Sequence, residues 1–154
     1  MSSSLVLAVN PGSTSTKIAV FDLHSKKLFQ KNIKHSAEDL APFEIITDQY
    51  EFRKNIILKE LEAGDIDIKE IEVVVGRGGL VKPIPSGMYK VNEPMKADLR
   101  KGILGQHASN LGGLIADDIA KSIGNAHAFI ADPVVVDEME ELARISGHPK
   151  FERI

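Results

Sequence analysis

The stretch LVLAVNPGSTSTKIAVFD, residues 5–22, decides how this chain begins to fold. An apolar run rich in strand-forming residues ends at Asn10-Pro11-Gly12, and a second such run begins at Lys17. Pro and Gly between two runs of this kind predict strands at residues 5–9 and 17–22 joined by a tight turn. Because a further strand is predicted at residues 27–34, we expect an antiparallel three-stranded meander.

The turn itself carries four consecutive hydroxyl side chains followed by a lysine, which is typical of a loop that wraps an anion such as phosphate. It is not a P-loop, because the glycine spacing differs and the lysine leads into a strand rather than a helix. An ordinary polar hairpin turn is the alternative interpretation. The candidate phosphate-binding residues are Asn10, Gly12, Ser13, Thr14, Ser15, Thr16 and Lys17.

Composition limits the classes of protein to which the chain can belong. Its 154 residues, 43% of them hydrophobic, suffice for one domain with an ordinary core. The net charge of −3 comes from mixed charges without a basic stripe, so we expect no nucleic-acid partner. The chain lacks cysteine, a cationic leader and any apolar run of membrane-spanning length, so we expect a cytoplasmic protein with no membrane partner.

The rest of the chain alternates predicted helices and strands, which indicates an α/β domain with a mixed sheet. The helix at 49–63 should be capped by Thr47 or Asp48, and the helix at 109–123 has the clearest apolar stripe. Further helices are predicted at residues 92–102 and 137–145, and further strands at residues 71–75, 88–91 and 127–131.

Arg77 is the first candidate for chemistry, because it follows a predicted buried strand. Ligands bind at such strand ends in open α/β sheets, and an arginine fork grips a carboxylate or phosphate through two hydrogen bonds. The neighbouring Gly78 and Gly79 would let a ligand approach the backbone closely. The alternative is a surface arginine in a glycine-rich turn.

His107 and Asp132 are the other two candidates. His107 precedes the helix at 109–123, where it could donate to a phosphoryl oxygen or extend the apolar stripe as a buried histidine. Asp132 follows the strand at 127–131 and could bind Mg²⁺, orient Arg77, or merely cap a turn. The pair Gly112-Gly113 lies inside a predicted helix, so something must approach the helix backbone there.

Four motifs in a fixed order carry a family resemblance: NPGSTSTK at residues 10–17, VVVGRGGL at 73–80, GQHASNLGG at 105–113 and FIADPVVVDEM at 129–139. In this order they resemble the acetokinase family, and within it the butyrate kinases. The resemblance extends over essentially the whole chain. It implies the actin-like, sugar-kinase and Hsp70 ATPase fold, a ribonuclease H-like α/β domain with a five-stranded type of mixed sheet and flanking helices.

The resemblance also implies an activity: ATP and butanoate would be converted reversibly to ADP and butanoyl phosphate, with Mg²⁺. Residues 1–154 would form the N-terminal domain, and the C-terminal nucleotide-binding domain would be absent from this chain. We therefore expect the isolated chain to be inactive and the complete enzyme to be a homo-oligomer. The alternatives are a kinase of acetate, propionate or a branched-chain acid, and a non-catalytic module of the same fold.

Family roles fall on matching positions. Asn10 and the residues from Gly12 to Lys17 resemble the first phosphate-binding hairpin. Arg77, with Gly78 and Gly79 beside it, resembles the arginine that holds the substrate carboxylate and the transferring phosphoryl group. The resemblance implies that His107 stabilises the phosphoryl group during its transfer and that Asp132 is the catalytic aspartate. It also implies that Asn10 and Asp132 bind the metal ion.

Overall fold

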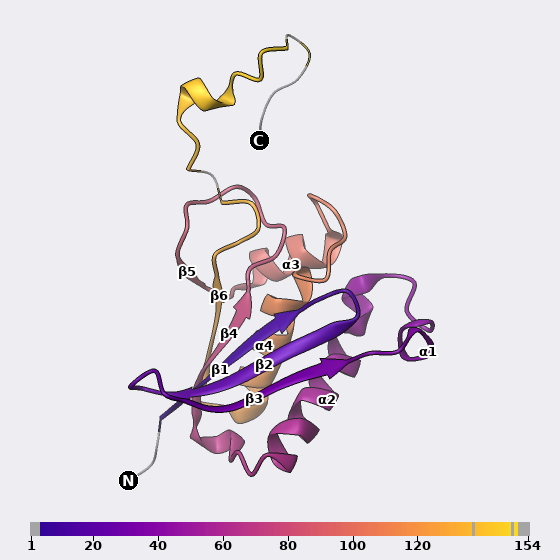
Figure 1. The fold of residues 1–154 in the computed structure, drawn as a ribbon, viewed down its shortest axis with the longest axis vertical. Helices are drawn as coiled ribbons and strands as arrows, with labels where there is room; N and C mark the ends of the chain where they lie inside the picture. Colours follow the sequence, from indigo (N-terminus) through magenta and orange to yellow (C-terminus); the bar gives the residue numbers. More distant parts are fainter. Residues whose placement is uncertain (1–3, 137, 149, 151–154) are drawn as a thin grey trace.

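The computed structural model describes residues 4–136, 138–148 and 150. Its centre is a six-stranded sheet in the order β3-β2-β1-β4-β6-β5 (Figure 1). The strands are β1 (Leu5–Pro11), β2 (Ser15–Asp22), β3 (Lys27–Lys34), β4 (Ile71–Arg77), β5 (Met88–Lys90) and β6 (His127–Ala131). The first three form the predicted antiparallel meander, while β4 and β6 run parallel to β1.

The mixed α/β sheet is confirmed, and its six strands match the six predicted segments, one more than the five-stranded type that the resemblance implies. The additional strand is β5, which pairs antiparallel with β6 through Met88, Tyr89 and Lys90. A three-residue strand closes the edge because the segment after β4 folds back beside β6 before the next helix begins. Such short strands are usual at sheet edges, where one side lacks a pairing partner.

Two helices cover one face of the sheet, α2 (Tyr50–Ala63) and α4 (Asn110–Ile123), and they contact each other. In Figure 1 both lie behind the strands. Helix α3 (Glu93–Lys101) lies within the predicted residues 92–102, begins after an Asn92 cap and packs on α4. The shorter helical segments are α1 (Ala37–Leu40), η1 (Ile46–Gln49), η2 (Ile68–Glu70) and η3 (Glu141–Arg144).

The core lies between the sheet and these two helices. Successive strand side chains point to opposite faces, so Leu5, Leu7 and Val9 of β1 are buried against α4 and its neighbours. The alternate residues Ala8 and Asn10 point to the opposite face and stay accessible. This alternation sends the polar end of β1 away from the core and leaves it available to a ligand.

Helix α2 begins and packs differently from the prediction. Thr47 and Asp48 lie inside η1, and Gln49 precedes the first α-helical residue, so neither of the two expected residues is the cap. The fully buried face of α2 consists of Arg53, Ile57 and Leu61, spaced four residues apart. An arginine therefore occupies a position where the pattern predicts an apolar residue.

The helix predicted at residues 137–145 is wrong for the described residues. Residues 138–140 are not helical, and only the single turn η3 forms after them, while Asp137 lies outside the described residues. Leu142 and Ile145 remain exposed, so this segment gains no buried apolar face that would stabilise a helix. Among the described helices, none is long and apolar enough to span a membrane.

Candidate functional site

Strand register brings three predicted site residues into one row. Asn10 of β1 pairs with Lys17 of β2, and the neighbouring residue Val9 pairs with Gly76 of β4. Asn10, Lys17 and Arg77 are all exposed, and they alternate with buried residues along their strands. Asn10 and Arg77, 67 positions apart in the chain, thus lie on neighbouring strands, on the face that α2 and α4 leave open.

Asp132 lies one strand further along, directly after β6. Its backbone has a positive φ of 44°, which is uncommon for a residue with a side chain. The Asp132 N–H donates to the Gly87 carbonyl at 3.0 Å, and the Gly87 N–H donates to the Asp132 Oδ1 at 3.1 Å. These bonds hold the carboxylate in a backbone conformation that the sequence alone would not favour.

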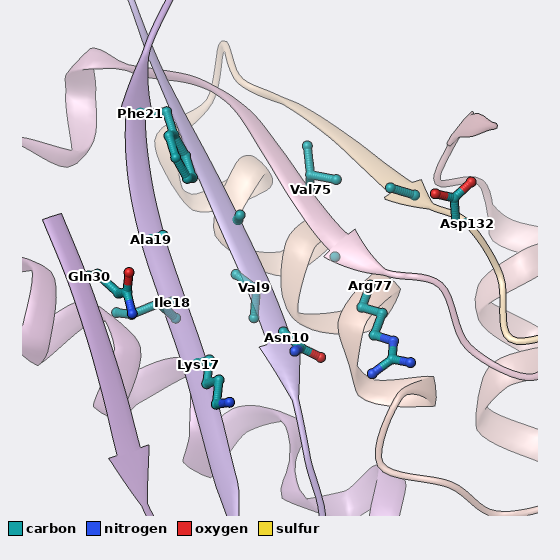
Figure 2. Close-up of a pocket in the computed structure, with 13 residues that line it drawn as sticks. Val9, Asn10, Lys17, Ile18, Ala19, Phe21, Gln30, Val75, Arg77 and Asp132 are labelled. Atoms are coloured by element: carbon teal, nitrogen blue, oxygen red, sulfur yellow. The ribbon is translucent and has the colours of Figure 1, made fainter. Parts of the chain in front are cut away.

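These four polar residues border one pocket of about 590 Å³. Figure 2 shows Asn10, Lys17 and Arg77 at the ends of neighbouring strands, with Asp132 beyond the end of β6. Arg77 and Asp132 form no salt bridge with each other, so the structure gives no support to the alternative in which Asp132 orients Arg77 directly. The floor of the pocket is apolar and includes Ala8, Ala19, Phe21 and Val75.

Glycines let the elements around this pocket approach each other. A Cβ added at Gly112 would lie closer than 3.0 Å to the Arg77 carbonyl oxygen, and one added at Gly76 would collide with the Gly112 backbone. A Cβ at Gly78 would collide with Pro133, next to Asp132. The prediction that something approaches the backbone at Gly112 is therefore confirmed, and the approaching group is the strand that carries Arg77.

Gly79 is buried against Leu99 and Asn110. The Asn110 Oδ1 accepts from the Leu80 N–H at 2.9 Å, and its Nδ2 donates to the Gly105 carbonyl at 3.0 Å. The close contacts that Gly78 and Gly79 permit in this structure are contacts within the chain. Substrate contact by these two glycines stays a prediction.

His107 is exposed, which excludes the interpretation as a buried core histidine. The Ser109 N–H lies 3.2 Å from its Nδ1, and the Ser109 Oγ lies 2.7 Å from the same atom. Because Nδ1 accepts from the backbone, the neutral ring carries its proton on Nε2, which can donate to a ligand. His107 does not border the pocket described above, so a contact with the phosphoryl group stays a prediction.

The turn between β1 and β2 is held from inside the protein. Arg53 of α2 donates to the carbonyl oxygens of Gly12, Ser13 and Ser15 at 2.7, 3.1 and 3.2 Å. Thr16 is fully buried, and its Oγ1 lies 3.1 Å from the Arg53 Nη1 and 2.9 Å from the His35 Nε2. The Thr16 hydroxyl thus lies on the inner side of the turn, whereas Ser13 and Thr14 are exposed.

Burial shapes the electrostatics behind the turn. Desolvation lowers the pKa of Arg53 to about 10, which still leaves the guanidinium charged at neutral pH. Burial and, second, the Arg53 charge lower the pKa of His35 below its ordinary value of 6.5. A neutral His35 beside a charged Arg53 is the state that this geometry favours.

The residue types around the pocket fit Mg²⁺. Asn10 and Asp132 supply an amide oxygen and a carboxylate at the same pocket. Among the described residues no group of three His, Cys, Asp or Glu side chains could hold a metal by itself. Mg²⁺ commonly takes one or two protein oxygens and completes its shell with phosphates and water, so this sparse set suits it.

Arg53, His35 and Asn110 are the important residues that were not identified as candidates from the pattern. Arg53 had one detectable signal, because it precedes Ile57 and Leu61 at intervals of four on the buried face of α2. A charged residue in such a series requires a polar partner. The identity of that partner, a turn about 40 residues earlier, depends on the fold.

Comparison with known proteins gives relatives over most of the chain. Butyrate kinase 1 of Clostridium acetobutylicum is 55% identical over 142 residues, which are 92% of this chain and 39% of that protein. The probable butyrate kinase of Bacteroides thetaiotaomicron is 54% identical over 149 residues, 97% of this chain and 41% of that protein. The resemblance inferred from the motifs is confirmed, and the chain spans about two fifths of these relatives' length.

The fold has a solved counterpart. Acetate kinase of Porphyromonas gingivalis superposes with a TM-score of 0.53 at 18% identity, covering 83% of this chain and 37% of that structure. This likeness confirms the fold class expected from the motifs. No protein-family model matches the chain.

Proposed function

We propose that this chain is the N-terminal part of a carboxylate kinase that interconverts ATP and butanoate with ADP and butanoyl phosphate. One observation carries the proposal: identity of more than 50% to butyrate kinases extends across the row of Asn10, Lys17, Arg77 and Asp132. The pocket offers cationic donors at its polar end and apolar side chains on its floor. A short fatty acid and a phosphate chain require this combination.

Arg77 would hold the substrate carboxylate and the transferring phosphoryl group. A carboxylate is already ionised at neutral pH, so the reaction needs alignment and charge neutralisation rather than a general base. The guanidinium fork can neutralise the oxygens of both groups as they approach. Lys17, on the neighbouring strand, would add a point charge at the phosphate side.

Asn10 and Asp132 would hold Mg²⁺ on its nucleotide. When bound, the ion would neutralise charge on the phosphate oxygens. The positive φ of Asp132 and its bond from Gly87 orient the carboxylate before any ligand arrives. His107 would donate its Nε2 proton to a phosphoryl oxygen, a role that requires substrate to reach past the described pocket.

The remaining parts of the proposal concern the complete protein. Since the curated relatives are more than twice as long as the matched segment, a second domain would supply the adenosine site and the second phosphate hairpin. The isolated 154 residues would then be inactive. A cytoplasmic location goes with this proposal, because ATP is the phosphoryl donor, and the family resemblance adds a homo-oligomeric state.

The test uses the natural protein that carries residues 1–154, expressed from its whole reading frame. Acyl phosphate is trapped with hydroxylamine after incubation with Mg-ATP and butanoate, acetate, propionate or isobutanoate. We expect the highest kcat/KM with butanoate, and a preference for another acid would reassign the substrate. If none of the four acids yields hydroxamate, the chain is a non-catalytic module of this fold.

The isolated 154 residues provide the matching measurement in the same assay. We expect no acyl phosphate above the background without enzyme. Turnover comparable to that of the complete protein would contradict the requirement for a second domain. Circular dichroism of the same sample shows whether the inactive chain is folded.

A further inference from the structure

The side chain of Arg53 is the most deeply buried charge in the described part of the protein, with 1% of its surface exposed. Its guanidinium donates to three carbonyl oxygens of the turn between β1 and β2. It also donates to the Gln49 Oε1 from Nη2 at 2.7 Å and from Nε at 3.1 Å. The side chain thus joins the first turn of α2 to the predicted phosphate loop.

Neutral oxygens alone surround this charge. None of the carboxylates in the described residues forms a salt bridge with Arg53. Burial lowers the pKa of Arg53, and the oxygens that replace water around the cation belong to uncharged carbonyl, amide and hydroxyl groups. A buried cation without an anionic partner is costly, and an anion that binds close to it would reduce that cost.

The bonds from Arg53 also decide which groups the turn presents to solvent. The carbonyl groups of Gly12, Ser13 and Ser15 point inward, towards the guanidinium. Carbonyl oxygens would repel a phosphate, so turning them inward leaves the hydroxyl side chains of Ser13 and Thr14 on the exposed side. The loop therefore has an inner side of acceptors and an outer side of donors.

We propose that Arg53 is the positioning residue of the phosphate loop, and that its buried charge is the countercharge for a polyphosphate bound on the outer side. The inference rests on the proposed function, because it requires phosphate at this turn. Arg53 does not touch the ligand. It holds the loop in the binding conformation before the ligand arrives and attracts the anion through the loop.

The experiment compares three variants in the complete natural protein. Arg53→Met removes the charge and the donors, Arg53→Lys keeps the charge but loses the fork, and Lys54→Met is the control. Lys54 is the next residue of α2, but its ammonium bonds the Asp118 carboxylate at 2.6 Å, so it does not support the turn. Titration calorimetry with inorganic tripolyphosphate and with adenosine, in the presence of Mg²⁺, measures the two halves of nucleotide recognition.

We expect Arg53→Met to raise the Kd for tripolyphosphate and the KM for ATP at least about ten-fold, since both a charge and several hydrogen bonds are lost. The KM for butanoate and the Kd for adenosine should change less than about two-fold. Arg53→Lys should recover part of the loss. If Arg53 had only a structural role, Arg53→Met would lower the melting temperature but leave the tripolyphosphate Kd of the folded protein unchanged. That result overturns the proposal.

A measurement on the wild-type protein decides the case in which Arg53→Met does not fold. The ¹⁵N signals of the Arg53 guanidinium should shift when tripolyphosphate is added, and should not shift with adenosine. An unmoved Arg53 signal at saturating tripolyphosphate overturns the proposal. If the wild-type protein does not bind tripolyphosphate at all, the proposed function fails, whereas binding that no Arg53 variant weakens refutes this inference alone.

Discussion

Replacing Gly112 by alanine should force α4 away from β4 and disturb the position of Arg77. A Cβ at Gly112 would lie closer than 3.0 Å to the Arg77 carbonyl oxygen, whereas ordinary contacts begin at 3.4 Å. Both groups are backbone or fixed to it, so no side chain can rotate to relieve the collision. The helix must therefore shift by several tenths of an ångström or more.

The magnitude follows from two opposing effects. Overpacking usually costs about 1–3 kcal/mol, and because both groups are rigid we expect about 3–4 kcal/mol here, at and above the upper end of that range. Alanine in place of glycine inside a helix returns about 1 kcal/mol. The net loss of about 2–3 kcal/mol should lower the melting temperature by about 4–12 °C for a chain of this length.

The adjacent Gly113→Ala provides the matched control. Its added Cβ would lie 3.0 Å from the Leu99 Cδ1, at the end of a flexible side chain, and 3.1 Å from the Ile130 Cγ2 methyl group, and neither contact is with backbone. Both contacts need a shift of only a few tenths of an ångström, so the packing cost of about 1 kcal/mol should nearly cancel the gain in helix propensity. The two substitutions lie at adjacent positions of α4. They differ in what the added Cβ contacts, which is backbone at Gly112 and side-chain methyl groups at Gly113.

The assay is urea unfolding of the 154-residue chain, followed by circular dichroism, together with kcat/KM of the complete protein. We expect Gly112→Ala to lower kcat/KM about 100-fold, because misplacement of Arg77 of this size disrupts alignment. Gly113→Ala should stay within about three-fold of the wild type. Equal stability of the two variants would refute the close approach of α4 to β4 as the reason for the glycine.

Three further predictions address single residues. Because the pKa of His35 is lowered on folding, the folded state binds protons less readily than the unfolded chain, so stability present above pH 6.5 should fall as the pH drops below it. Urea midpoints at pH 7.5 and 5.5 should therefore differ more for the wild type than for His35→Gln, and equal differences would contradict this. Arg77→Lys keeps the charge but loses the bidentate fork, so it should lower kcat/KM for butanoate about 100-fold or more without changing the melting temperature. A change of less than about three-fold in kcat/KM would refute the role of Arg77 in binding the substrate. Asn110→Ala leaves the Leu80 N–H and the Gly105 carbonyl without their partner, so urea denaturation should show a free energy of unfolding lowered by about 2–4 kcal/mol. The control Asn92→Ala, which removes an exposed helix cap, should lower it by about 1 kcal/mol.

Local patterns predicted most of the elements correctly. The meander, the helices ending at Gly64 and Gly124, and the strand before Asp132 all follow from alternation, helical spacing and stop residues. The helix at residues 137–145 was wrong because propensity alone does not stabilise a segment whose apolar residues find no core. The extra strand β5 was predicted as a segment, but its place in the sheet depends on pairing with β6.

The candidate site divides in the same way. The sequence by itself determined which residue types lie at the strand ends. Each of four polar residues adjoins an apolar, strand-forming run: Asn10, Lys17, Arg77 and Asp132. Only the tertiary structure decided that these four border one pocket, because strand order and register join residues far apart in the chain. The inner support of the loop by Arg53 is likewise a tertiary fact: a buried charge takes its partners from whatever backbone the fold places around it.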